Sequence, residues 1–144
     1  MTSLTGATAT IYLSITGLFP TPVKIEGFAA DDVFSMDDMQ VVETLRGVDG
    51  KLSGGYVYAD IRQRFSIQAD SPSAALFDTW FNAMQVARDT FTATGTTNLT
   101  ALGTNWTMQK GFLRNFKPIP DVKKLIQPRQ FTIEWEAIFP SPVQ

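Results

Sequence analysis

Residues 66–81 read SIQADSPSAALFDTWF, and this stretch changes its hydrophobic pattern in the middle. Up to Ala69 apolar residues alternate with polar ones, which is the period of a β-strand with one buried face. After Ser71-Pro72 the spacing becomes helical, with apolar residues at Leu76, Phe77, Trp80, Phe81 and Met84. The change predicts one helix inserted into a chain that is otherwise made of strands.

The predicted helix covers about residues 72–87. Ser71 or Asp70 can accept hydrogen bonds from the free N–H groups of its first turn, and Pro72 suits the first helical position. Leu76, Trp80 and Met84 fall in one row, with Phe77 and Phe81 in the next. We therefore expect these five apolar side chains to pack the helix against a sheet.

The rest of the chain predicts strands with alternating faces. We expect Asp37-Asp38 to connect a hairpin, the glycines of 53–55 to lie in a loop, and Phe19-Pro20-Thr21-Pro22 to interrupt pairing, because proline donates no ladder bond. The expected strands, about eight in all, are 9–16, 23–28, 33–36, 40–46, 56–69, 104–108, 111–116 and 129–138, with a short strand followed by an exposed loop within 90–104. We expect 104–108 and 111–116 to form a hairpin. The predicted fold is mainly β, an antiparallel β-barrel or sandwich with one flanking α-helix and extended loops and arms.

Composition limits the chemistry available to the chain. Its 144 residues suit a single domain spanning 1–144, with 44% hydrophobic and 18% charged residues. The chain has no Cys and no His, which excludes disulfides, thiol nucleophiles, Cys/His zinc sites and Ser-His pairs. A net charge of -2 argues against a protein that binds nucleic acid by neutralising phosphates. We expect no cofactor, no metal and no enzymatic activity.

The acidic residues leave two weaker alternatives open. Three acidic pairs could act as general acid and base, as in glycosidases, or could bind calcium; they are Asp31-Asp32, Asp37-Asp38 and Glu134 with Glu136. The spacing lacks the pattern of an EF-hand loop, and acids in turns or on a solvated strand face explain these pairs more simply. The N-terminus lacks the basic region of a signal peptide, and no apolar run is long enough for a membrane helix.

Extended segments at the N-terminus, around 117–130 and in FPSPVQ indicate an assembling protein, because such arms usually lie on another chain. Aromatic residues at 12% are also abundant for so small a core. A basic cluster is either a solvated face or a surface for an acidic patch on a partner; its members are Lys110, Arg114, Lys117, Lys123, Lys124 and Arg129.

The order of these features resembles the tail tube proteins of long-tailed bacteriophages. The resemblance rests on strands followed by GVDGKLSGGYVYADIRQRFSIQADSPSAALFDTWF (47–81), a Thr-rich loop and a final RQFTIEWEAIF strand (129–139). It implies hexameric rings that stack into a hollow tube, which conducts phage DNA into the host, with relatives in contractile injection systems. It also implies a structural virion protein assembled in the host cytoplasm, with tail sheath or baseplate proteins as partners and no membrane anchor.

Two sets of residues are candidate assembly surfaces. The candidate for contact between rings is a loop whose glycines give it an adaptable backbone. An ordinary mobile hairpin loop would have the same sequence features. The candidate loop comprises Arg46, Gly47, Asp49, Gly50, Lys51, Leu52, Ser53, Gly54 and Gly55. The polar faces of two long strands are the candidate lining of the bore, at Asp60, Arg62, Arg64, Glu134 and Glu136. DNA would pass this lining without sequence-specific binding.

The sequence is also compatible with a second class of function, a binding module. The chain could be a small β-barrel binding module that holds a carbohydrate or peptide through Tyr56, Tyr58 and Trp106. Such a module predicts a soluble monomer with a ligand, whereas a tube protein predicts rings or filaments.

Overall fold

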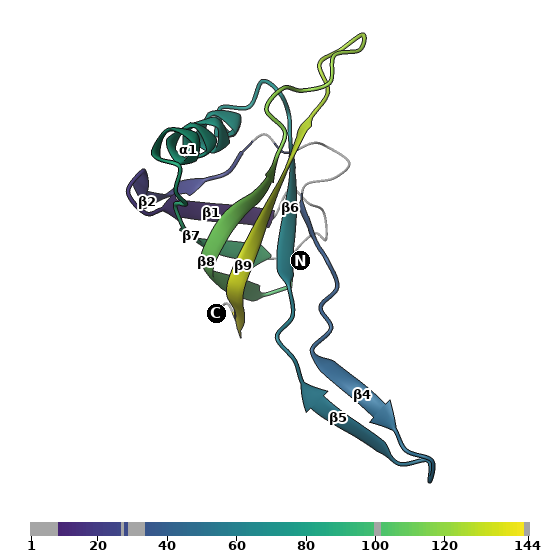
Figure 1. Ribbon diagram of the computed structural model, residues 1–144. Helices are drawn as coiled ribbons and strands as arrows, with labels where there is room; N and C mark the ends of the chain where they lie inside the picture. The colour runs from purple at the N-terminus through teal and green to yellow at the C-terminus, as the bar shows by residue number, and fades with distance from the viewer. Residues whose placement is uncertain (1–8, 27, 29–33, 100–101, 143–144) are drawn as a thin grey trace.

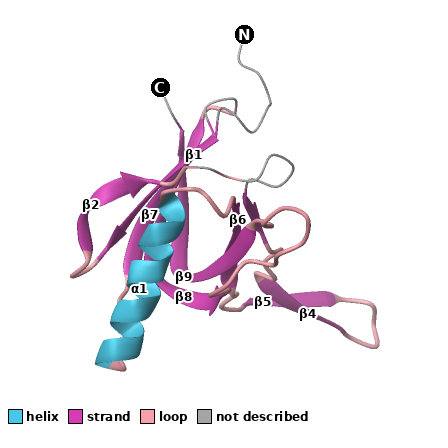
Figure 2. Ribbon diagram, turned by 90° about the horizontal axis from the view of Figure 1, so that it is seen from above, coloured by secondary structure: helices cyan, strands magenta, loops and turns pink. Residues whose placement is uncertain are grey.

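The computed structural model describes residues 9–26, 28, 34–99 and 102–142. Within these residues the chain forms nine β-strands and a single α-helix, so the predicted mainly β fold is confirmed (Figures 1 and 2). The elements are β1 (Ala9–Ile15), β2 (Phe19–Lys24), β3 (Phe34–Met36), β4 (Val42–Arg46), β5 (Leu52–Tyr56), β6 (Ile61–Ile67), α1 (Ser73–Ala87), β7 (Ala93–Leu99), β8 (Thr104–Phe116) and β9 (Arg129–Pro142).

Seven of the strands form one antiparallel sheet in the order β2-β1-β7-β8-β9-β6-β3. The sheet curls until β6 comes close to β7, where Gln63 Nε2 donates a hydrogen bond to Thr97 Oγ1 at 3.3 Å. It does not close into a barrel, because β2 and β3 remain its two edges. The architecture is therefore sandwich-like, which is the second of the two predicted forms.

The core lies inside the curl, beneath α1. The ring of Phe77 on α1 stacks on Phe131 of β9 with centroids 4.4 Å apart and planes 4° apart, and Phe65 of β6 contacts the same ring at 6.1 Å. Trp80 is fully buried, and its indole Nε1 donates a hydrogen bond to the Phe91 carbonyl at 2.9 Å. Figure 2 shows α1 lying against the sheet, so that it covers apolar surface that an open sheet would otherwise expose.

Ser71 and Ser73 tie the start of α1 to the chain that follows β2. Ser71 Oγ accepts a hydrogen bond from the Ser73 amide at 3.2 Å and donates one to the Glu26 carbonyl at 2.6 Å. Ser73 Oγ accepts in turn from the Glu26 amide at 2.7 Å. The helix ends at Ala87, and the next residue, Arg88, caps it in the left-handed conformation with a φ of 52°, which is common at helix C-termini. The helix predicted at about 72–87 is confirmed.

The connections between strands differ from the prediction. Asp37-Asp38 does not join a hairpin, because β3 pairs with β6, and β4 pairs with β5 in a separate two-stranded sheet. The expected loop glycines Gly54 and Gly55 lie inside β5, opposite Thr44 and Glu43. The single strand expected over 56–69 is broken, since β6 begins only at Ile61. Pairing across the sheet decided these boundaries, and local propensity did not.

Two sites expected to break strands are accommodated. Pro20 and Pro22 lie within β2, where an edge strand leaves one row of its N–H positions unpaired. Residues 104–116 form one strand and not a hairpin, with Lys110 at a φ of 51° marking an irregularity. Gly111 lies directly on Trp135, so that a Cβ there would fall 2.5 Å from the indole ring. Glycine at this position allows the two strands to pack closely.

We expect Trp80→Ala to lower the free energy of unfolding by about 3–5 kcal/mol, because it removes a fully buried aromatic side chain and leaves a cavity. Urea denaturation followed by circular dichroism measures this change. Val86→Ala on the exposed side of the same helix is the matched control and should change stability by less than about 0.5 kcal/mol. Equal effects of the two variants would contradict the packing described here.

Candidate functional site

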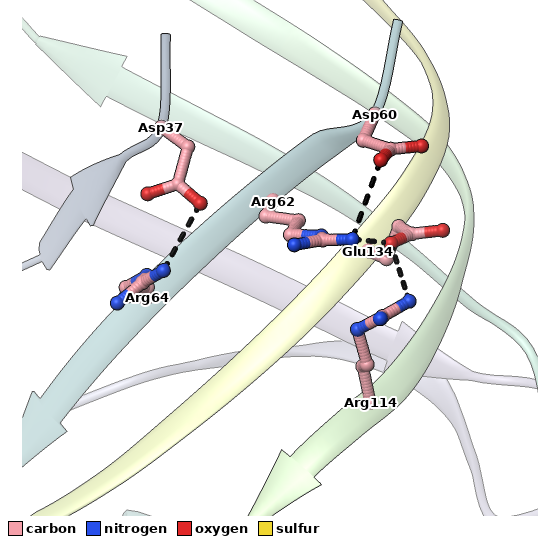
Figure 3. Close-up of polar contacts among 6 residues, drawn as sticks. All are labelled: Asp37, Asp60, Arg62, Arg64, Arg114 and Glu134. Carbon is pink, nitrogen blue, oxygen red and sulfur yellow. Dashed lines mark hydrogen bonds and ion pairs between the residues drawn. The ribbon is translucent and has the colours of Figure 1, made fainter.

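The outer face of β6, β9 and β8 carries a set of charged side chains that we call the charged face. Alternation along β6 and β9 directs Gln63 and Ile133 inward and places their neighbours outside. Arg62 of β6 is the register partner of Glu134 of β9, so these two outward side chains lie side by side. Figure 3 shows Arg114 of β8 reaching the same carboxylate from the other side.

Glu134 is the centre of this network. Its Oε1 accepts hydrogen bonds from Arg62 Nε at 3.1 Å and from Arg114 Nη1 at 3.0 Å. Arg62 Nη2 also donates to Asp60 Oδ2 at 3.3 Å. The hydrogen bond to Glu134, with the nearby carboxylates, raises the pKa of Arg62 above its usual value. Each arginine on this part of the face is therefore held by an acid.

The remaining charges of the face are also paired. Arg64 Nη2 donates to Asp37 Oδ2 at 3.1 Å, and Lys110 Nζ lies 3.9 Å from Glu136 Oε2. The five residues proposed from the sequence as bore lining thus share one face. Asp37, Lys110 and Arg114, which the sequence did not assign to the lining, complete it. The face carries four acids, Asp37, Asp60, Glu134 and Glu136, against four bases, Arg62, Arg64, Lys110 and Arg114.

The nine residues proposed from the sequence as a contact between rings lie in the turn and in β5 of the β4–β5 hairpin, with Arg46 at the end of β4, and this hairpin projects from the body (Figure 1). Both strands of this hairpin are exposed along their whole length. The turn is held by its own residues: the Gly47 amide donates to the Lys51 carbonyl at 2.8 Å and Arg46 Nη1 donates to the Gly50 carbonyl at 2.9 Å. The hairpin is therefore ordered by local bonds and not by a core.

Apolar side chains are concentrated on this hairpin although nothing within the described chain covers them. Val48 at the turn is fully exposed, Leu45 is 76% exposed and Leu52 is 60% exposed. Tyr56 and Tyr58 follow, with their rings in edge contact at 5.5 Å. Exposed apolar groups gathered on a protruding element are typical of a surface that contacts another molecule.

The basic cluster predicted from the sequence is not one surface. Arg114 belongs to the charged face, while Lys123 and Lys124 lie in the loop between β8 and β9. Arg129 is buried: it forms a two-pronged ion pair with Asp78 of α1, at 2.7 and 3.2 Å, and its guanidinium lies 5.0 Å from the ring centre of Phe131. No local sequence pattern indicates this pair, because its members are 51 residues apart.

Two of the three aromatic residues of the binding-module alternative line separate hollows among the described residues. Tyr58 lies at a hollow beside the hairpin base, whereas Trp106 lines a separate apolar depression of about 300 Å³ with Phe34 and Met36. Tyr56 lines neither of them. A single ligand would therefore not contact all three side chains in this arrangement.

Among the described residues, no group of three or more Asp and Glu side chains is arranged to hold a metal ion. No described helix has both the length and the apolar character that crossing a bilayer requires.

The fold is shared with components of contractile injection systems. It resembles a chain of the anti-feeding prophage baseplate (TM-score 0.62, 13% identity, covering 100% of this chain and 97% of that chain). It also resembles a chain of the cap that terminates the anti-feeding prophage tube (TM-score 0.62, 12% identity, 99% and 93% covered). A third similar chain is from the sheath-tube complex of the PVC extracellular contractile injection system in its extended state (TM-score 0.59, 15% identity, 92% and 88% covered).

Residues 2–139 match the model of the family described as "Tail fiber protein gp32", and the chain belongs to this family. No curated protein matches the chain. The family and the similar structures are named as parts of tails and injection systems, and none is named as an enzyme, in agreement with the predicted absence of catalysis. The phage-tail character expected from the sequence is thereby confirmed.

We expect Glu134→Gln to lower the melting temperature at low salt, because it leaves Arg62 and Arg114 facing each other without their shared carboxylate. The loss should shrink at high salt, since the screening length falls from about 10 Å at 0.1 M to about 3 Å at 1 M. Thermal denaturation at both salt concentrations measures the effect. Glu136→Gln, whose carboxylate is 3.9 Å from Lys110, is the control and should change little; a loss for Glu134→Gln that does not depend on salt would argue against the network.

Proposed function

We propose that this chain, as a single domain over residues 1–144, is the tail tube subunit of a bacteriophage. In this proposal hexameric rings stack into a hollow tube that conducts DNA, with tail sheath or baseplate proteins as neighbours, in a virion assembled in the host cytoplasm. The proposal is supported by membership of a tail protein family and by a fold that extends over most of a chain from a sheath-tube complex. The observation that carries it is the combination, in one small body, of a charge-balanced sheet face and a projecting apolar hairpin.

In the proposed tube the charged face lines the bore, with Asp60, Arg62, Arg64, Glu134 and Glu136 toward the DNA. DNA carries about one negative charge per 1.7 Å, so a basic lining would bind it and slow its passage. The arginines of this face are already paired with carboxylates, at 3.0 to 3.3 Å. A lining of paired charges offers phosphates little net attraction, which suits a conduit.

The β4–β5 hairpin, including the residues from Arg46 to Gly55, is proposed as the contact between rings. It projects beyond the body, so it can reach a neighbour that the body itself does not touch (Figure 1). Burying the side chains of Leu45, Val48 and Leu52 in such a contact would contribute roughly 1.5–3 kcal/mol each. That gain explains why a soluble subunit would keep these side chains exposed before assembly.

The family description favours a second candidate, a component of the tail fibre or of the tail end. The matches to a baseplate chain and to a tube-terminating cap chain are compatible with this alternative. The two candidates differ in where the protein lies in the particle. A tube subunit is distributed along the whole tail, whereas a fibre or tail-end component is confined to one end.

We expect the purified protein to form uniform hollow rings or tubes in negative-stain electron microscopy at rising concentration, with light scattering that increases in parallel. Immunogold labelling of phage particles with split tails should then place the protein along the entire tube. Labelling restricted to the tail end would favour the second candidate. A strictly monomeric protein at high concentration would contradict the tube proposal.

We expect the double variant Val48→Asp and Leu52→Asp to remain folded and to lose tube formation, because carboxylates would have to be buried at the proposed contact between rings. Light scattering and electron microscopy report assembly, and circular dichroism reports folding. Val86→Asp, an equally exposed apolar position on α1, is the matched control and should assemble as the wild type does. Normal tubes from the double variant would exclude the hairpin from the contact.

A further inference from the structure

The loop between β8 and β9 is a second apolar protrusion, at the opposite end of the molecule from the β4–β5 hairpin. In Figure 1 it rises at the top of the view, while the hairpin descends at the bottom. Four large apolar side chains of this loop are exposed, by 58–77% of their surface, namely Ile119, Val122, Leu125 and Ile126. Such a concentration at a loop end has no structural use in an isolated subunit.

This loop is held in shape and is positively charged. Lys117 Nζ forms an ion pair with Asp121 Oδ2 at 2.8 Å, and the Gln127 amide donates to the Asp121 carbonyl at 2.8 Å. Lys117 also accepts, through its carbonyl, a 3.0 Å hydrogen bond from the buried Arg129. Lys123 and Lys124 take part in no ion pair among the described residues, so the end of the loop presents two free cations beside its apolar side chains.

The base of the β4–β5 hairpin has the complementary character. A hollow of about 350 Å³ lies there, and Val57 and Tyr58 contribute apolar surface to it. Three acids, Asp38, Glu43 and Asp60, line the same hollow. Asp38 and Glu43 form no ion pair with any described residue, so their charges are available to a partner.

We propose that the loop of residues 117–128 of one copy docks into the hollow at the hairpin base of the next copy. Leu125 and Ile126 would cover Val57 and Tyr58, and Lys123 and Lys124 would face Asp38 and Glu43. The occupant is a second copy of this chain, because the apolar and charged groups of the two ends match and because the ends point in opposite directions. This inference rests on the proposed function and specifies the surface that receives each ring.

The contact is head-to-tail, so repetition of it produces a stack and not a closed pair. One loop in one hollow buries far less than the roughly 1,200 Å² of a stable interface and would be weak by itself. Several such contacts form together when one ring meets another, and linked weak contacts gain strength through a high effective concentration. Ring formation would therefore precede stacking.

Charge reversal tests the pairing of the two surfaces. The loop variant Lys123→Glu with Lys124→Glu and the hollow variant Asp38→Lys with Glu43→Lys should each form rings. Neither should form tubes at the concentration at which the wild type does, because the concentration needed for tubes should rise by roughly tenfold or more. A mixture of the two variants should form tubes again, because each reversed loop then meets a reversed hollow. The chain that carries all four substitutions should also assemble by itself.

The controls separate this inference from the proposed function. Lys24→Glu, an exposed charge reversal on β2, should leave tubes unchanged, and circular dichroism checks that every variant is folded. Wild-type protein without rings or tubes overturns the proposed function and this inference together. If the wild type forms tubes, three results overturn this inference alone. The first is normal tubes from either double variant, and the second is loss of rings in a folded double variant. The third is that neither the mixture nor the fourfold variant recovers tubes.

Discussion

An open, curled sheet leaves its apolar face in water unless another element covers it, and in this chain α1 is that element. The stack of Phe77 on Phe131 and the burial of Trp80 hold the helix on the sheet. The ion pair between Asp78 and Arg129 fixes the same helix to the first residue of β9. Because Arg129 also bonds to Lys117, the position of the β8–β9 loop depends on this packing.

The molecule consequently divides into a body held by its core and two protrusions held by local bonds. The hairpin keeps its shape through five register pairs between β4 and β5 and through its own turn. The loop keeps its shape through the contacts of Asp121 and Arg129. Elements with so few buried contacts open at low free energy, so a neighbour can adjust them without disturbing the body.

Much of the fold could be predicted from the pattern of residues 66–81 and from the alternation in 129–138, because both signals are local. The wrong strand boundaries were predicted where pairing with distant parts of the chain determines the structure. Gly54 and Gly55 are poor strand formers, but they lie in a strand because they pair with β4. Lys110 and Gly111 stay inside β8 because the Trp135 side chain occupies the space above Gly111.

The charged face illustrates the same limit for the candidate site. Alternation showed that Arg62 and Arg64 lie on one side of their strand and that Glu134 and Glu136 lie on one side of theirs. Only the register of β6 on β9 places Arg62 beside a carboxylate 72 residues away. The partners Asp37 and Arg114 come from two further strand regions, beside β3 and in β8, which pair with β6 and β9 respectively. The family comparison agrees with a phage-tail protein, although its description names a fibre where the sequence resemblance named a tube.

The two edges of the sheet have a mechanical consequence for any assembly of this chain. Within the described part of the chain, prolines in β2 remove donors from one edge and β3 is a three-residue strand at the other, so these described edges are poorly suited to extend the ladder into an adjacent copy. Copies would then meet through side chains, whose contacts tolerate small rotations better than a continuous ladder of backbone hydrogen bonds. A filament built in this way would bend at its joints while the body of each subunit stays rigid.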